Sequence, residues 1–488
     1  MTDGDEKRDP SAGVVDRTLS SVRRAGRQTG RHAGLATLAL VALTGTARAH
    51  SGSLGGAVTS ATVPTWLTVL TGGVVVGASF LFTTLLTDHE AMRAVNWWRA
   101  GLPSPPGVWR VVRGGVGALA VVALAAVVAI GLVGPTTPTR NLALLVVWAG
   151  WWAGYTISTY LVGNTWPAVN PWRALAAGVG RVLGRARSEV RSSLPERWGV
   201  WPSVVGLLAL VYVEVVSPIG QNPRLLAAVI VGYSVVTVAG AVRYGAAWFD
   251  RVDPVSRVFA AYGRVAPLQR DEDGLSLRVP GTALTDEPLG ERPGETAFVV
   301  ALLWVTTYDG LVATPTWANA VEPVVSVGVP ALLVYVLVLV AGFGLFLGVY
   351  RLASRRVRDS AETYVTATEI ERWFAPALLP IAAGYHLAHF LGYFLALSPA
   401  LAAVVANPLA PSETVALVLP SWFSTFRLLC VLGGHVLAVW VAHSLAFELF
   451  PGVLAAIRSQ FPSVVVMIFY TMTSLWVITQ PYVPPPFV

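Results

Sequence analysis

Four histidines lie within two long apolar stretches of the sequence, and their imidazoles are the side chains best suited to do chemistry. They are His386 and His389 in the stretch 374–397, and His435 and His443 in the stretch 426–447. An ionisable side chain inside a bilayer is costly, so each one marks a candidate functional site. Imidazole nitrogens bind transition metals, and they also take up and release protons near neutral pH.

Two acidic side chains, Glu214 and Asp309, lie in apolar stretches as well. If these stretches are helices that cross a bilayer, each acid lies about twelve residues, or about 18 Å, from the inner end of its span. The same arithmetic places His386 and His435 at about that depth. We therefore expect the four side chains to share one level of the membrane.

A transition-metal centre is the first chemistry that these groups suit. Three histidines with one or two carboxylates match the ligand preferences of zinc, iron, manganese or copper. A metal would polarise a substrate or activate water, and a carboxylate would serve as the base. The predicted metal ligands are His386, His389, His435 and His443, and the predicted catalytic carboxylates are Glu214 and Asp309. His386 and His435 would also suit bis-histidine ligation of haem.

The same groups admit other interpretations. Histidines and acids inside a membrane relay protons or pass metal ions, which predicts a conduit or transporter. A haem- or copper-binding redox or assembly subunit would use the histidines as cofactor ligands. The simplest alternative is packing, because a histidine in a span commonly bonds to a neighbouring helix, and nearby glycines let helices approach closely. Those glycines are Gly384, Gly392, Gly433 and Gly434.

The composition indicates a membrane protein. Hydrophobic residues make up 54% of the chain and charged residues only 12%, whereas a soluble domain averages about 25% charged residues. The lone cysteine, Cys430, excludes an internal disulfide and a cysteine-rich metal site. The net charge of +7 is accounted for by loop arginines, so no nucleic-acid partner is predicted.

About twenty apolar residues cross the hydrocarbon core of a bilayer, and ten stretches approach or exceed that length. They are 64–86, 114–133, 142–162, 202–217, 225–242, 297–313, 324–350, 374–397, 426–447 and 461–480. The predicted fold is therefore an all-α, polytopic transmembrane helical bundle. Most arginines fall in alternate loops, which the positive-inside rule assigns to the cytoplasm. The other side keeps only Arg140, Arg224 and Arg427.

Two long loops, 163–201 and 243–296, fall on the cytoplasmic side of this topology. The first contains an amphipathic pattern after Pro171, which predicts a helix on the inner leaflet. The second contains a candidate helix from Pro254 to Val265. The remainder of that loop is rich in Asp, Gly and Pro and is too short for a separate domain.

Residues 1–49 resemble a polar N-terminus followed by a signal segment. Arginines precede a short apolar stretch, and Ala47-Arg48-Ala49 has small residues at both recognition positions for cleavage. Cleavage after Ala49 would make His50 the first residue of a single domain, 50–488, with its first residue on the extracytoplasmic side. A free amine together with its own imidazole chelates copper(II), so His50 is a further candidate ligand.

Several short motifs, in order along the chain, are similar to a family of multi-span membrane proteins named fenitrothion hydrolases. They are Ala49-His50, Asn170-Pro171-Trp172, Asp253-Pro254-Val255-Ser256, Gly263-Arg264-Val265-Ala266-Pro267, Asp273-Gly274-Leu275, Ala388-His389, Gly434-His435-Val436 and Ala442-His443. The resemblance covers most of the chain after residue 50. It implies a membrane-bound hydrolase of organophosphorus esters that acts with a second membrane subunit.

Overall fold

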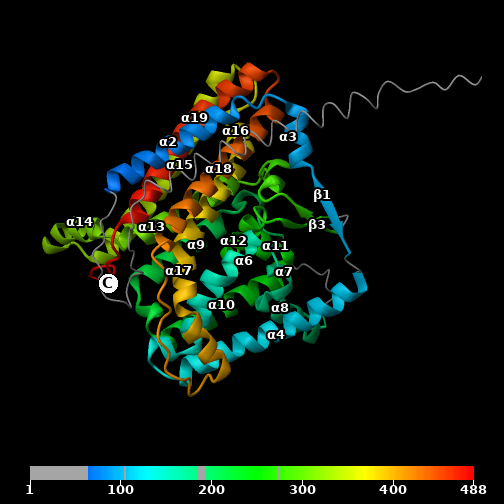
Figure 1. Cartoon of the computed structure of the whole chain (residues 1–488). Coiled ribbons are helices and arrows are strands. Elements are labelled where there is room, and N and C mark those ends of the chain that lie inside the picture. Colours follow the sequence, from blue (N-terminus) through cyan, green and yellow to red (C-terminus); the bar gives the residue numbers. More distant parts are fainter. Residues whose placement is uncertain (1–63, 104–105, 185–192, 272–273, 488) are drawn as a thin grey trace, which may run out of the picture. The chain divides into compact units, whose positions relative to one another are not determined.

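The computed structural model describes residues 64–103, 106–184, 193–271 and 274–487. The predicted signal segment, its cleavage site and the candidate ligand His50 lie outside these residues. All the described residues belong to one unit, in which helices predominate (Figure 1). The predicted all-α class is confirmed.

The apolar stretches form helices close to the predicted positions. Nine helices of the described chain are long and apolar enough to cross a membrane, and a tenth is shorter. They are α2 (Thr65–Thr83), α4 (Pro106–Val133), the run of α5 (Leu142–Leu144), η2 (Leu145–Tyr155) and α6 (Thr156–Leu161), the shorter α9 (Trp201–Val216), α10 (Pro223–Tyr244), α13 (Glu295–Val312), α15 (Ala331–Ala361), α17 (Leu379–Ala406), α18 (Phe423–Leu449) and α19 (Val453–Thr479).

The predicted stretch 324–350 differs most from the structure. Its first residues belong to a separate helix, α14 (Pro315–Ser326), and α15 begins only at Ala331. Gly328 interrupts the helical conformation between them with a φ of 94°, which lies in the left-handed region that favours glycine. Pro330, which has no N–H to donate, then stands at the N-cap of α15.

Short elements connect these helices. They are α3 (His89–Asn96), η1 (Pro138–Arg140), α7 (Trp166–Val169), α8 (Pro171–Val182), η3 (Glu196–Trp198), η4 (Pro218–Gly220), α11 (Ala246–Arg251), α12 (Pro254–Gly263), η5 (Thr282–Thr285), α16 (Ala367–Phe374) and η6 (Ala375–Leu378). Both predicted loop helices are present, as α8 and α12. Each begins with an Asx-Pro pair, and the Asn170 and Asp253 side chains accept backbone N–H bonds from Arg173 and Ser256.

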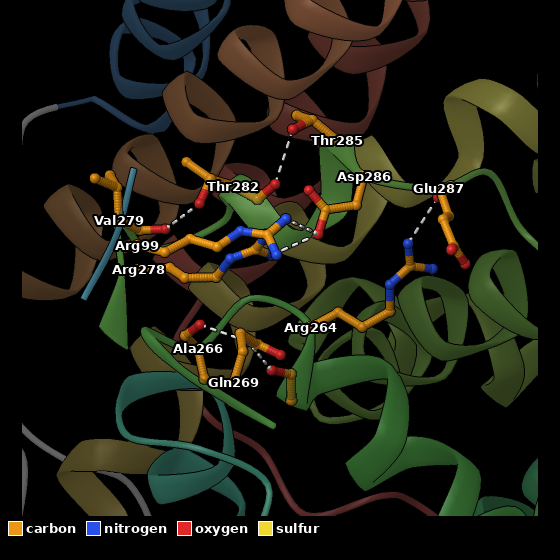
Figure 2. A network of polar contacts seen from close by, with 11 residues as sticks. Arg99, Arg264, Ala266, Gln269, Arg278, Val279, Thr282, Thr285, Asp286 and Glu287 are labelled. Atoms are coloured by element: carbon orange, nitrogen blue, oxygen red, sulfur yellow. Dashed lines mark hydrogen bonds and ion pairs between the residues drawn. The ribbon is translucent and has the colours of Figure 1, made fainter. Parts of the chain in front are cut away.

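One feature was not predicted: a three-stranded antiparallel sheet of β1 (Arg99–Leu102), β3 (Gly274–Arg278) and β2 (Leu268–Asp271), in that order. Arg99 pairs in register with Arg278. Figure 2 shows both guanidinium groups directed at Asp286, with the Arg278 Nη1 atom 2.6 Å from the carboxylate and the Arg99 Nη2 atom 3.6 Å from it.

Helix α13 forms the centre of the packing. It is the most buried of the span-length helices, and α9, α15, α17 and α19 all pack against it. The pair α17 and α18, which carries the four histidines, is the most extensively packed pair of helices. Elements η2 and α6 lie against the other side of α17, so the histidine-bearing helix has neighbours around it.

Candidate functional site

Helices α17 and α18 cross at two glycines. A Cβ atom on Gly384 would lie 2.9 Å from the Gly434 Cα atom, and one on Gly434 would lie 2.4 Å from the Pro380 carbonyl oxygen. These contacts are with backbone, which cannot move aside, so the crossing requires glycine at both positions. The predicted close approach is confirmed there, whereas Gly433 has open space around it.

His386 is buried on the side of α17 away from this crossing. Its Nδ1 atom lies 3.1 Å from the hydroxyl oxygen of Tyr160 in α6. The rings of Trp152, Tyr160, Tyr262 and Phe390 surround the imidazole. The carbonyl of Trp152 lies near the ring, yet the buried Nε2 atom makes no hydrogen bond among the described residues. A buried polar atom without a partner calls for a water molecule, an ion or a ligand.

The π-helix η2 helps to form this pocket of aromatic rings. It carries Trp152 against His386 and packs along α17. Helices with the wider i→i+5 pattern occur mostly as short segments, often at functional sites, because they change which side chains face a neighbour. The buried Tyr262 hydroxyl, contributed by α12, also lacks a hydrogen-bond partner here. His386 Nε2 and Tyr262 are therefore two unsatisfied polar groups beside the same ring cluster.

His435 and His443 have different surroundings. The Nδ1 atom of His435 lies 2.8 Å from the Val431 carbonyl oxygen one turn earlier, and its buried Nε2 atom has no hydrogen-bond partner in the part of the chain that the structure describes. Both nitrogens of His443 already face protein oxygens, with Nδ1 2.9 Å from Gln460 Oε1 and Nε2 3.0 Å from the Leu86 carbonyl. His443 therefore connects α18 to α19 and to the segment after α2.

His389 and Asp309 face each other across α17 and α13, in a contact that becomes an ion pair when the imidazole is protonated. The Nε2 atom of His389 lies 3.4 Å from Oδ2 of Asp309, and each side chain is about a quarter exposed. Glu214 on α9 lies close enough to Asp309 for the two carboxylates to interact electrostatically. Both acids stand within one turn of their helix ends, because α9 ends before Ser217-Pro218 and α13 ends at Val312.

Two tyrosines border this acid–histidine cluster of Glu214, Asp309 and His389. Tyr385 stacks its ring over His389, with 6.0 Å between centroids and an interplanar angle of 10°. Its hydroxyl group lies against Gly310, where a Cβ atom would be 2.5 Å from the oxygen. Tyr482, in the segment after α19, lies within electrostatic range of both carboxylates.

The predicted site residues do not form one cluster in the structure. Asp309, His389 and Glu214 come together, and His386 lies one turn from His389 within electrostatic range. No hydrogen bond, ion pair or ring contact between described residues joins His386 to His435. Within the same residues, no three His, Cys, Asp or Glu side chains are arranged to hold a metal ion. The predicted transition-metal cofactor thus stays a prediction, and we derive no step from it.

Sequence reasoning did not single out Tyr160, Tyr262 or Tyr385. Each is an isolated tyrosine in an apolar or loop segment, so nothing in its local pattern distinguished it from packing. Arg427, predicted to lie on the outer side, donates from its Nε atom to the Ala388 carbonyl over 2.7 Å and connects α18 to α17.

Comparison with known proteins adds no family assignment. The chain matches no protein-family model, no curated protein and no solved structure. The resemblance to fenitrothion hydrolases therefore remains an expectation based on the motifs alone.

Proposed function

We propose that the chain is a multi-pass protein of the cell membrane, with its arginine-rich loops in the cytoplasm and the residue 50 side outside. The support is the set of long apolar helices and their exposed apolar residues. Phe82 is 71% exposed and Val236 is 59% exposed, which would be unfavourable in water. Contact with lipid tails removes that cost.

We further propose that the chain conducts protons through the acid–histidine cluster. The observation that carries this proposal is the ion pair of His389 with Asp309, partly exposed and close to a second carboxylate. In this proposal the cluster takes up protons at its partly exposed carboxylates, and His386 lies one turn behind it with its Nδ1 atom 3.1 Å from the Tyr160 hydroxyl. Carboxylate, imidazole and phenol groups in sequence are the usual components of a proton relay.

A phosphotriester hydrolase is the second candidate. In this alternative, His389 acts as the general base and Asp309 orients its ring, the relationship that many hydrolases use. The motif resemblance implies an organophosphorus ester as substrate. Access to solvent at this pair is compatible with a substrate that approaches from the outer side.

One reconstitution experiment tests both candidates. Protein in phosphatidylcholine liposomes loaded with a pH-sensitive dye is given a pH step, and p-nitrophenyl phosphotriester hydrolysis is followed in the same preparation. We expect Asp309→Asn to slow proton entry at least about tenfold. The matched control is Glu322→Gln, an exposed acid of α14, and it should behave as wild type.

The outcomes separate the candidates. Wild-type liposomes that take up protons no faster than protein-free liposomes would refute the conduit. Hydrolysis lost in His389→Gln would then support the enzyme, and the absence of both activities would refute both proposals.

A further inference from the structure

A cavity of about 400 Å³ lies where the N-terminus of α13 meets α15 and α16. Its lining is rich in arginine, with Arg292, Arg351, Arg355 and Arg372. It belongs to neither the acid–histidine cluster nor the His386 pocket. In the proposed topology this end of α15 is cytoplasmic.

The charges in the cavity do not balance. Glu291 lies 3.4 Å from Arg372, and Glu371 lies 3.5 Å from Arg351. The third acid, Glu295, is bound at 2.6 Å by Arg257, which is outside the lining. Arg355 also acts electrostatically on Glu371, so four lining arginines share only Glu291 and Glu371, and the cavity carries an excess of positive charge that would attract an anion.

The N-terminus of α13 adds backbone donors beside the same space. Helix α13 starts after Gly294, which has a φ of 93° and, as a glycine at the N-cap, has no side chain to bind the first N–H groups. Thr296 and Ala297, both in the first turn, line the cavity. Uncapped N–H groups and the helix dipole favour a negative charge at this position. Guanidinium groups opposite them supply paired donors, which suit phosphate oxygens.

We propose that this cavity binds a phosphate group, carried by the headgroup of an anionic phospholipid or present as free phosphate. The lipid source has support from α15, because Leu345 and Leu352 on the same helix as Arg351 and Arg355 are both more than half exposed. Acyl chains would lie against these leucines while the headgroup occupies the cavity. That placement rests on the proposed membrane topology, whereas phosphate binding itself does not.

The test compares Arg355→Gln with Arg356→Gln in the full chain. Both residues are exposed on α15 and both changes remove one positive charge, but only Arg355 lines the cavity. Detergent-solubilised protein is titrated with short-chain phosphatidic acid, with short-chain phosphatidylcholine and with inorganic phosphate, and bound ligand is counted by native mass spectrometry. We expect Arg355→Gln to weaken phosphatidic acid binding about tenfold, with Arg356→Gln unchanged.

Each result bears on the proposal. Arg355-dependent binding of phosphatidic acid identifies a lipid site, and Arg355-dependent binding of inorganic phosphate alone identifies a soluble ligand. Equal binding by the two variants for every ligand would overturn the proposal. Proton flux is measured separately, on the same variants reconstituted in liposomes, so loss of the conduit proposal would leave the binding result intact.

Discussion

The Nε2 atom of His389 lies 3.4 Å from Oδ2 of Asp309, and this pair joins α17 to α13 at the only point where a span histidine meets a carboxylate among the described residues. His389 sits one turn from the buried His386 on the same side of the helix. The pair therefore places a partly exposed acid one helical turn from an enclosed imidazole, and the proposed proton path would run between them.

The first prediction concerns the dependence of His389 and Asp309 on each other. If protons pass through the pair, His389→Gln, Asp309→Asn and the double variant should all slow proton flux to a similar low rate, because the second change removes a path already broken. The coupling energy between the two substitutions, measured from the free energies of unfolding of the single and double variants, should stay below about 1 kcal/mol because both side chains are partly exposed. Additive losses of flux would contradict a shared path.

The second prediction concerns the crossing of α17 and α18. Gly384→Ala places a Cβ atom 2.6 Å from the Cys430 carbonyl oxygen and should destabilise the protein by about 1–3 kcal/mol, because both backbones must separate. Gly433→Ala, with nothing within 4 Å, is the matched control and should be neutral or slightly stabilising. Thermal unfolding in detergent measures both, and equal melting temperatures would show that the crossing tolerates a methyl group.

The same crossing explains why helix positions followed from the sequence but the direction of the histidines did not. Apolar stretch lengths determined the helices to within a few residues in most cases. His386, however, lies two residues after Gly384, about 200° around the helix, so it points away from α18 when the glycine faces it. The prediction that His386 and His435 bind one metal or haem required knowing which side of α17 meets α18, and one sequence does not contain that information.

Contacts between segments far apart in the chain were also not predictable from the sequence. Tyr160 bonds His386 from 226 residues away, and β1 pairs with β3 although residues 103–273 separate the two strands. These strands are four and five residues long, which is too short to show a clear alternation of apolar and polar side chains. The Asx-Pro helix starts were predictable because a cap depends only on its own few residues.

The third prediction concerns His443. Its two ring nitrogens face Gln460 and the Leu86 carbonyl, so it has no nitrogen left for a metal. His443→Ala should lower the unfolding free energy by about 1–3 kcal/mol, because the substitution leaves a cavity and removes the ring's hydrogen bonding to the buried Gln460. Elemental analysis should give the same metal content for this variant and wild type, with the double variant His386→Ala/His435→Ala as the comparison. A fall in metal content in His443→Ala would show that the histidine rearranges to bind metal.

The last prediction concerns Asp253, which caps α12 and accepts hydrogen bonds from Ser256 and from the Tyr233 hydroxyl. Burial raises the pKa of this carboxyl above its ordinary value. As pH rises, the folded state therefore keeps its proton to a higher pH than the unfolded state does. The contribution of Asp253 to the free energy of unfolding is fully present below about pH 4, and it is lost as pH rises through the folded-state pKa. Asparagine caps helices as well as aspartate and carries no charge at any pH.

We therefore expect the melting temperature of Asp253→Asn to rise relative to wild type as pH increases from about 4 to about 8. Asp250→Asn is the control, because it removes an exposed carboxyl three residues earlier in the chain. Differential scanning fluorimetry in one detergent at several pH values measures both. A difference for Asp253→Asn that stays constant or falls with pH would mean that the carboxyl is ionised in the fold, held by Ser256 and Tyr233 strongly enough to offset its burial.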